Sequence, residues 1–89
     1  MACVPEICRF LGIVIRMYWL DHEPPHFHAQ YGEYSAQLRI APFGILRGHL
    51  PPRVLAAVAE WATLEEAGLL ENWRRLHNKE APLRLPPLE

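Results

Sequence analysis

The chain concentrates groups that can bind a metal or move protons in one short segment. Residues 21–28 read DHEPPHFH and hold three of the five histidines together with two carboxylates. On a strand, His26 and His28 would stand side by side, about 6.5–7 Å apart at the backbone. Each neutral imidazole offers one lone pair to a transition metal, and Asp21 or His22 could complete a site of two histidines and one carboxylate.

The same segment also suits metal-free acid–base chemistry on RNA. One histidine of the pair would deprotonate the ribose 2′-hydroxyl, the other would protonate the leaving 5′-oxygen, and an arginine would stabilise the charge on phosphorus. A third interpretation is structural: the His-x-His pair is ordinary surface, and Asp21 and His22 form a hydrogen-bonded turn before Pro24. The residues alone leave metal binding, catalysis and a structural or partner-binding role open.

Alternation of polar and apolar residues predicts that the pair lies on a strand. Residues 26–31 and 34–40 alternate with period two on either side of Gly32-Glu33, which is typical of a hairpin. Residues 13–19 are β-branched and aromatic, which favours another strand, and residues 45–47 could form a fourth strand at an edge. One face of these strands is apolar and must be buried.

The opposite face carries polar, aromatic and cationic side chains, and we take it as the candidate site. Its members are Arg16, Tyr18, His26, His28, Gln30, Gln37 and Arg39. The candidate catalytic residues are Asp21, His22, His26 and His28. The candidate substrate-binding residues are Arg16 and Arg39 for phosphate, Tyr18 for stacking on a base, and Gln30 and Gln37.

The second half of the chain is predicted to be helical. Pro51-Pro52 can open a helix, because the first helical position needs no N–H group. Apolar residues then recur at helical spacing, at Leu55, Val58, Ala62, Leu69, Trp73 and Leu76. The pattern weakens at Glu65-Glu66 and Gly68, which predicts a kink or two helices.

These elements predict one domain over residues 1–89, with strands at about 9–47, helices at about 52–78 and an extended or loose tail at about 81–89. Neither layer can bury its apolar side alone, so we expect an α+β fold. Its antiparallel sheet of three to four strands would carry the C-terminal helices on one face. A chain of 89 residues builds only a small core, so oligomers or partners are common at this size.

Composition limits the classes of function. Nine basic against ten acidic residues give a net charge of -1, which argues against a histone-like binder of nucleic acid but allows a local arginine patch. No apolar stretch approaches the ~20 residues that span a membrane, and no secretory signal pattern begins the chain. We expect a cytoplasmic protein with no membrane association, in which Cys3 and Cys8 stay reduced.

Residues 9–18 (RFLGIVIRMY) and 21–32 (DHEPPHFHAQYG) closely resemble the bacterial domain-of-unknown-function family 4160. The resemblance extends to residues 48–51 with Arg53, to Glu60-Trp61 and to residues 70–73. It covers nearly the whole chain, from about Pro5 to Leu88. The D-H-x-P-P-H-F-H run is highly specific, whereas Gly68 departs from the helical pattern expected there.

The resemblance implies a genetic setting and no established activity. Family members are often encoded beside a second small protein, an arrangement similar to toxin–antitoxin pairs. We therefore expect a toxin-like component that acts on RNA through histidine acid–base chemistry, with a cognate small protein as its partner. The alternatives are a non-catalytic interaction module that docks a partner, or a small metal-binding protein that uses the His-x-His pair.

The sequence predicts no cofactor. Structural zinc sites usually contain cysteine, and nothing in the sequence brings Cys3 or Cys8 near the histidines. We expect the protein to be metal-free, or to bind a divalent ion only weakly through His26 and His28. Asp21 would be the third ligand, provided that the Pro24-Pro25 loop folds back onto the strand.

Overall fold

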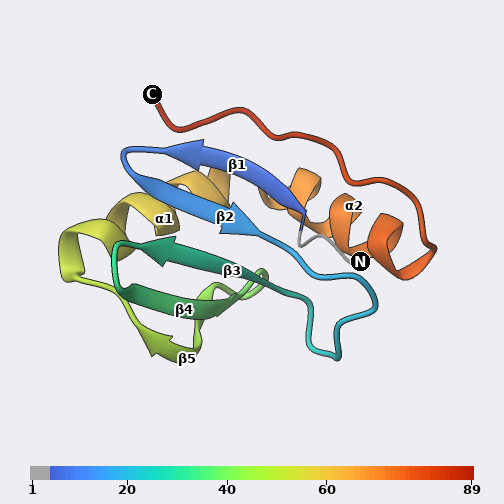
Figure 1. Ribbon diagram of the computed structural model, residues 1–89, viewed down its shortest axis with the longest axis horizontal. Coiled ribbons are helices and arrows are strands. Elements are labelled where there is room, and N and C mark those ends of the chain that lie inside the picture. Colours follow the sequence, from blue (N-terminus) through green and yellow to red (C-terminus); the bar gives the residue numbers. More distant parts are fainter. Residues whose placement is uncertain (1–4) are drawn as a thin grey trace.

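In the part of the chain that the structure describes, five antiparallel strands follow one another along the sequence and in space. The computed structural model describes residues 5–89, so the expectation for Cys3 lies outside the described residues. The strands are β1 (Glu6–Phe10), β2 (Ile13–Arg16), β3 (His26–Tyr31), β4 (Tyr34–Arg39) and β5 (Gly44–His49), as Figure 1 shows. The α+β class predicted from the sequence is confirmed, but the sheet has five strands where three or four were expected.

The additional strand is β1, which begins at Glu6, before the predicted start of the strand region at about residue 9. Its sequence EICRF mixes charged and apolar residues without a clear alternation. The segment forms a strand because it pairs with β2. A tight turn at Leu11-Gly12 connects the two strands, and both turn residues have positive φ. Glycine adopts such a conformation at little steric cost.

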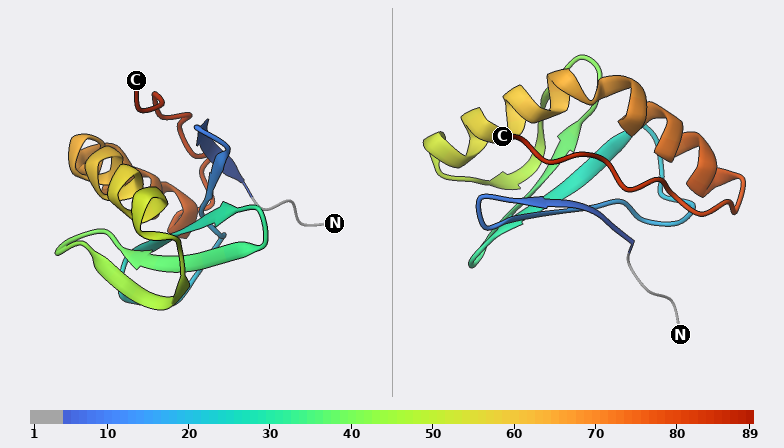
Figure 2. Two further views of the ribbon diagram at one scale, coloured as in Figure 1. Left: turned by 90° about the vertical axis from the view of Figure 1, so that its left-hand side faces the viewer. Right: turned by 90° about the horizontal axis from the view of Figure 1, so that it is seen from above.

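Two helices cover one face of the sheet, as Figure 2 shows. They are α1 (Pro52–Leu64) and α2 (Glu66–His77), separated at Glu65, which confirms the predicted kink or pair of helices. Pro52 occupies the first turn of α1, as the sequence predicts. Within residues 5–89, no helix is both long enough and apolar enough to cross a membrane.

The sheet face beneath the helices forms the core. Its strands contribute the apolar members of each alternating run, namely Ile13, Ile15, Phe27, Ala29, Ala36 and Leu38, all of them buried. The ring of Trp61 in α1 lies between Phe10 and Phe27, with centroid distances of 5.5 and 5.8 Å. Burying a phenylalanine side chain stabilises the fold by roughly 1.5–3 kcal/mol, so this packing fixes which face of each strand remains uncovered.

The C-terminal tail is extended and held in place rather than loose. It runs beside β1 and the helices in Figures 1 and 2. The backbone N–H of Leu85 donates to the carbonyl of Ile7 at 2.9 Å, and the indole N–H of Trp61 donates to the carbonyl of Pro86 at 2.8 Å. Leu85 also packs where Gly68 has no side chain, which explains a glycine inside α2.

Asn72 is the main polar anchor of the tail. Its fully buried side chain donates to the carbonyl of Leu83 at 2.9 Å and accepts from the N–H of Leu83 at 2.7 Å. Replacing Asn72 with alanine is expected to lower the free energy of unfolding by about 1–3 kcal/mol, because both backbone groups lose their partner. Chemical denaturation measures this change.

The matched control is Asn78→Ala, since Asn78 is an exposed asparagine at the end of the same helix. Its substitution is expected to change stability by less than about 0.5 kcal/mol. Limited proteolysis should cut the tail faster in Asn72→Ala than in Asn78→Ala. Equal stability and equal cleavage of the two variants would contradict this role of Asn72.

Candidate functional site

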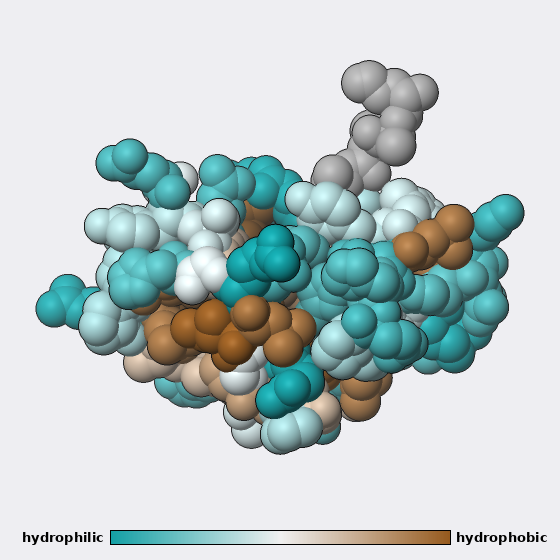
Figure 3. Space-filling view, turned by 90° about the horizontal axis from the view of Figure 1, so that it is seen from below, coloured by the Kyte–Doolittle hydropathy of each residue, from teal (hydrophilic) through white to brown (hydrophobic). Residues whose placement is uncertain are grey.

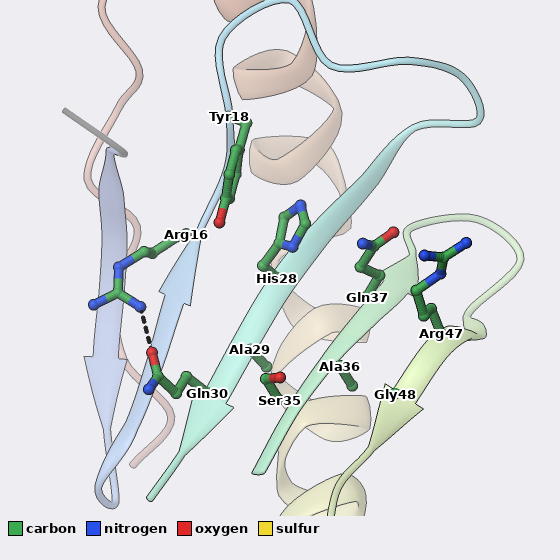
Figure 4. Close-up of a pocket in the computed structure, with 10 residues that line it drawn as sticks. All are labelled: Arg16, Tyr18, His28, Ala29, Gln30, Ser35, Ala36, Gln37, Arg47 and Gly48. Atoms are coloured by element: carbon green, nitrogen blue, oxygen red, sulfur yellow. Dashed lines mark hydrogen bonds between the residues drawn. The ribbon is translucent and has the colours of Figure 1, made fainter. Parts of the chain in front are cut away.

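A row of polar side chains crosses the sheet on the face opposite the helices, which we call the open face. The strand register places Arg16 of β2 beside His28 of β3, His28 beside Gln37 of β4, and Gln37 beside Arg47 of β5. Directly paired residues share a face of a sheet, and neighbouring strands lie about 4.7–4.9 Å apart. The four side chains therefore form one continuous row, as Figure 4 shows.

This row lines a shallow pocket with a volume of ≈ 190 Å³. Sites for small-molecule ligands are typically larger, about 300–1,000 Å³, so the pocket is better suited to one group of an extended ligand than to a whole buried one. Arg16 and Arg47 lie at its two ends, and no carboxylate of the described residues lines it. The pocket is therefore cationic although the whole chain has a net charge of -1.

Tyr18 and His28 meet in the lining of the pocket. Their rings lie 4.2 Å apart between centroids and are tilted by 37°. Tyr18 is also partly exposed, so one side of its ring supports His28 while the rest can contact a ligand. An aromatic ring beside a cationic row is a feature of surfaces that bind single-stranded nucleic acid.

Arg47 belongs to the pocket although sequence reasoning did not select it. Strict alternation along β5 would put Arg47 on the same face as Ile45. The register shifts between Gln37 and Leu38, so that Leu38 pairs with Ile45 and Gln37 pairs with Arg47, leaving Leu46 as an extra residue. Such a bulge reverses the faces beyond it, and Arg47 reaches the open face for this reason.

Asp21 lies behind His28, on the loop between β2 and β3. Its Oδ2 is 3.3 Å from Nε2 of His28, which donates to it because an ionised carboxylate can only accept. The other ring nitrogen of His28, Nδ1, has no hydrogen-bond partner among residues 5–89. A carboxylate that holds one ring nitrogen fixes the tautomer of a histidine and leaves its other nitrogen free to accept a proton.

The environment keeps His28 neutral and Asp21 ionised at pH 7. Burial lowers the pKa of His28 below its ordinary value, and the hydrogen bond to Asp21 opposes that change only in part. Burial raises the pKa of Asp21, but the hydrogen bonds from His28 and from the N–H of His22 outweigh it, so its pKa is lowered overall. The pair thus consists of a neutral imidazole and a carboxylate.

His77 positions the Asp21 loop from the far end of the chain. Its Nε2 lies 2.6 Å from the backbone carbonyl of Asp21, and its Nδ1 lies 2.9 Å from the carbonyl of Trp73. The end of α2 therefore touches the residue that orients His28. A histidine near a helix C-terminus is in sequence terms an ordinary surface residue, so only the packing of α2 against the loop reveals this contact.

His26 is buried, which corrects the expectation that it would be displayed on the open face. Only 2% of its surface is exposed, and its ring packs 5.3 Å from that of Trp73 in α2. Its Nδ1 donates to the carbonyl of Pro24 at 2.7 Å. A buried His26 cannot reach a substrate on the open face, so the expected division of acid and base between the two histidines has no geometric support.

The remaining predicted residues fall into two groups. Arg16 and Gln30 lie together at the pocket, where Arg16 donates to Oε1 of Gln30 at 2.7 Å, as the dashed line in Figure 4 shows. His22 points into solvent, with 81% of its side chain exposed. Arg39 lies outside the pocket lining and donates to the carbonyl of Pro42 at 3.0 Å, so it is engaged in the loop after β4.

Three potential metal ligands come together where the loop meets β3. One donor atom from each of Asp21, His26 and His28 lies within 4.8 Å of the others. The loop thus folds back in the way that a site of two histidines and one carboxylate needs. Cys8 is not part of this group; its buried thiol contacts the carbonyl of Pro86 in the tail.

Comparison with known proteins identifies a family. The family model described as Domain of unknown function (DUF4160) matches residues 12–74, which include β2 to β5, the loop that carries Asp21, and α1. No curated protein and no solved structure matches the chain.

Proposed function

This chain belongs to the DUF4160 family of domains of unknown function, and we propose that it binds single-stranded RNA on its open face and cleaves it at His28. The row formed by Arg16, His28, Gln37 and Arg47 carries the proposal. A row that crosses four strands offers contacts to an extended chain rather than to a compact ligand.

The chemistry of the row suits the backbone and bases of RNA. Arg16 and Arg47 supply guanidinium groups, which bind phosphate through paired N–H donors. The partly exposed ring of Tyr18 can stack on a base, an interaction worth about 1–3 kcal/mol per base. Proteins that recognise RNA by stacking its bases on aromatic side chains of a β-sheet bind single strands, because unpaired bases can unstack from one another.

His28 has the arrangement of a general base. In the proposed step, Nδ1 of His28 accepts the proton of a ribose 2′-hydroxyl while the 2′-oxygen attacks the adjacent phosphorus. The bond to the 5′-oxygen breaks, that oxygen takes a proton from water, and a 2′,3′-cyclic phosphate remains. The hydroxide that this leaves takes the proton from the imidazolium, which restores neutral His28. Asp21 stabilises the imidazolium that forms, and Arg16, next to His28 in the register, stabilises the charge on phosphorus.

Removing Arg47 tests the binding surface. Arg47→Ala is expected to weaken binding of a single-stranded RNA oligonucleotide at least about tenfold, because a hydrogen-bonded ion pair with phosphate contributes roughly 1.5–3 kcal/mol. The slope of log K against log salt should also fall by about 0.7 for each phosphate charge that the variant no longer neutralises. Fluorescence anisotropy at several salt concentrations measures both quantities.

The matched control is Arg53→Ala, which removes the same charge from an exposed position at the start of α1, outside the pocket. This control is expected to keep its affinity within about twofold and to keep the salt slope. If both variants bind as tightly as the unchanged protein, RNA does not use the open face. Equal weakening of both would indicate attraction by net charge alone.

In the cell, we propose that the protein is the toxin-like member of a two-gene module, as the gene pairing implied by the family resemblance suggests. Induced expression without the neighbouring gene should slow growth, and His28→Ala should relieve the effect. Normal growth with the unchanged protein, or equal toxicity of the variant, would exclude this role.

A second candidate function is partner docking at β5. β5 is the last strand of the sheet and is exposed along its length, and no backbone hydrogen bond among residues 5–89 crosses its outer edge. It carries the exposed apolar residues Ile45 and Leu46. Figure 3, which views the molecule from the side where β5 lies in Figure 1, has an apolar patch on that face. An open edge of this kind accepts an added strand.

Co-expression with the neighbouring small protein separates the two functions. Tight binding that Leu46→Lys disrupts, with no RNA cleavage by the freed protein, would favour the docking module over the enzyme. Size-exclusion chromatography of the protein alone shows whether the same edge pairs with a second copy of the chain instead.

A further inference from the structure

We propose that Asp21, His26 and His28 bind a divalent transition-metal ion such as Zn²⁺. The donor atoms would be Oδ2 of Asp21, Nε2 of His26 and Nε2 of His28. This inference goes beyond RNA binding and does not depend on it, because the three donor atoms lie close together whether or not the pocket binds RNA.

The unpartnered Nε2 of His26 is the first observation that points to an ion. Nδ1 of His26 donates to the carbonyl of Pro24, so in the neutral ring the lone pair is on Nε2. That nitrogen is buried and makes no hydrogen bond. It lies 2.9 Å from Oδ2 of Asp21, but the contact is not aligned as a hydrogen bond. Burying such an atom without a partner is costly, and a metal ion would satisfy it.

The hydrogen bond from Nδ1 of His26 to the Pro24 carbonyl is of the kind that supports metal-binding histidines. In metal sites, the ring nitrogen that does not bind the ion commonly donates to a backbone carbonyl or a carboxylate, which fixes the ring and its tautomer. The Pro24 carbonyl does this for His26. The end of α2 supports Asp21 in turn, through the contact of His77 with the Asp21 carbonyl at 2.6 Å.

The distances agree with a shared ion. Zinc ligands at about 2.0–2.1 Å in a tetrahedral site are about 3.3 Å from one another. Oδ2 of Asp21 lies 2.9 Å from Nε2 of His26 and 3.3 Å from Nε2 of His28. Two histidines and one carboxylate satisfy zinc and other ions that prefer imidazole, and they leave at least one coordination position to water.

The ion-bound state and the acid–base state of His28 exclude each other. An ion on Nε2 displaces the proton that this atom otherwise donates to Asp21, and the neutral ring then carries its proton on Nδ1. His28 in that state is a hydrogen-bond donor toward the pocket and no longer a base. Ion binding would therefore switch off the cleavage step proposed above.

Titration of the purified, untagged and chelator-treated chain with ZnCl₂ and CoCl₂ tests the site. Calorimetry is expected to give one equivalent of bound ion. The cobalt form should have visible absorption typical of nitrogen and oxygen ligands without a thiolate charge-transfer band, because Cys8 is not among the ligands. Asp21→Asn and His28→Gln should each weaken ion binding by at least about 100-fold. Even the loss of a residue that only hydrogen-bonds to a metal ligand lowers metal affinity by about 10–100-fold.

The control is His22→Ala, which removes the nearest exposed histidine; its Nδ1 lies 3.7 Å from the other oxygen of Asp21. It should bind the ion within about threefold of the unchanged protein. His26→Gln should also lose the ion, and Asp21→Asn and His28→Gln decide the matter if that buried variant fails to fold. No binding at millimolar ion, or equal affinity of Asp21→Asn and His22→Ala, would overturn the proposal, whatever the outcome for RNA.

Discussion

Gly48→Ala is expected to lower the free energy of unfolding by about 2–5 kcal/mol. Gly48 has φ +90°, and an added Cβ would lie 2.3 Å from the carbonyl oxygen of Ser35 and 2.8 Å from Cα of Ala36. Positive φ costs a residue with a side chain about 1–2 kcal/mol, and relieving such a clash costs about 1–3 kcal/mol more. The clashing atoms belong to the backbone of β4, so the two strands would have to move apart.

Thermal denaturation measures this effect. About 4–8 °C of Tm is lost per kcal/mol in a domain of this size, so Tm should fall by at least about 8 °C. The control is Gly32→Ala, at a second positive φ of +59° with nothing within 4 Å of the added Cβ. It is expected to cost only about 1–2 kcal/mol. Equal Tm values for the two variants would mean that β5 does not approach β4 as closely as described.

His28→Ala is expected to slow cleavage of single-stranded RNA by about 100- to 10,000-fold, the range that a general base contributes. Among the histidines of residues 5–89, only His28 lines the pocket, and Asp21 holds its Nε2 so that Nδ1 is left to accept a proton. Binding of the RNA should change much less, because Arg16 and Arg47 remain. Cleavage of a labelled oligonucleotide under single-turnover conditions, followed on gels, separates the two effects.

His49→Ala is the matched control for this prediction. His49 is an exposed histidine of β5 that does not line the pocket. The control should cleave at a rate within about twofold of the unchanged protein. If His28→Ala cleaves as fast as this control, the histidine is not the base. If His28→Ala cleaves slowly only because it no longer binds the RNA, His28 contributes to RNA binding rather than to proton transfer.

The sequence by itself determined the layers of the fold and most of the candidate site. The alternation around Gly32-Glu33 defined the hairpin of β3 and β4, with Phe27 on the buried face and His28 on the open one. The local sequence was enough to predict these faces, because successive side chains of a regular strand point to opposite faces of the sheet. The weak helical pattern near Glu65 likewise predicted the break between α1 and α2.

The tertiary structure alone decided which of these residues can act together. The bulge at Leu46 brings Arg47 into the row, and it arises from the pairing of β5 with β4 rather than from the sequence of β5. The burial of His26 depends on Trp73, a residue of the distant helix α2, and the Pro24-Pro25 loop brings Asp21 to both histidines. Alternation assigns a side chain to a face, but whether another element covers that face depends on long-range packing, which no local pattern contains.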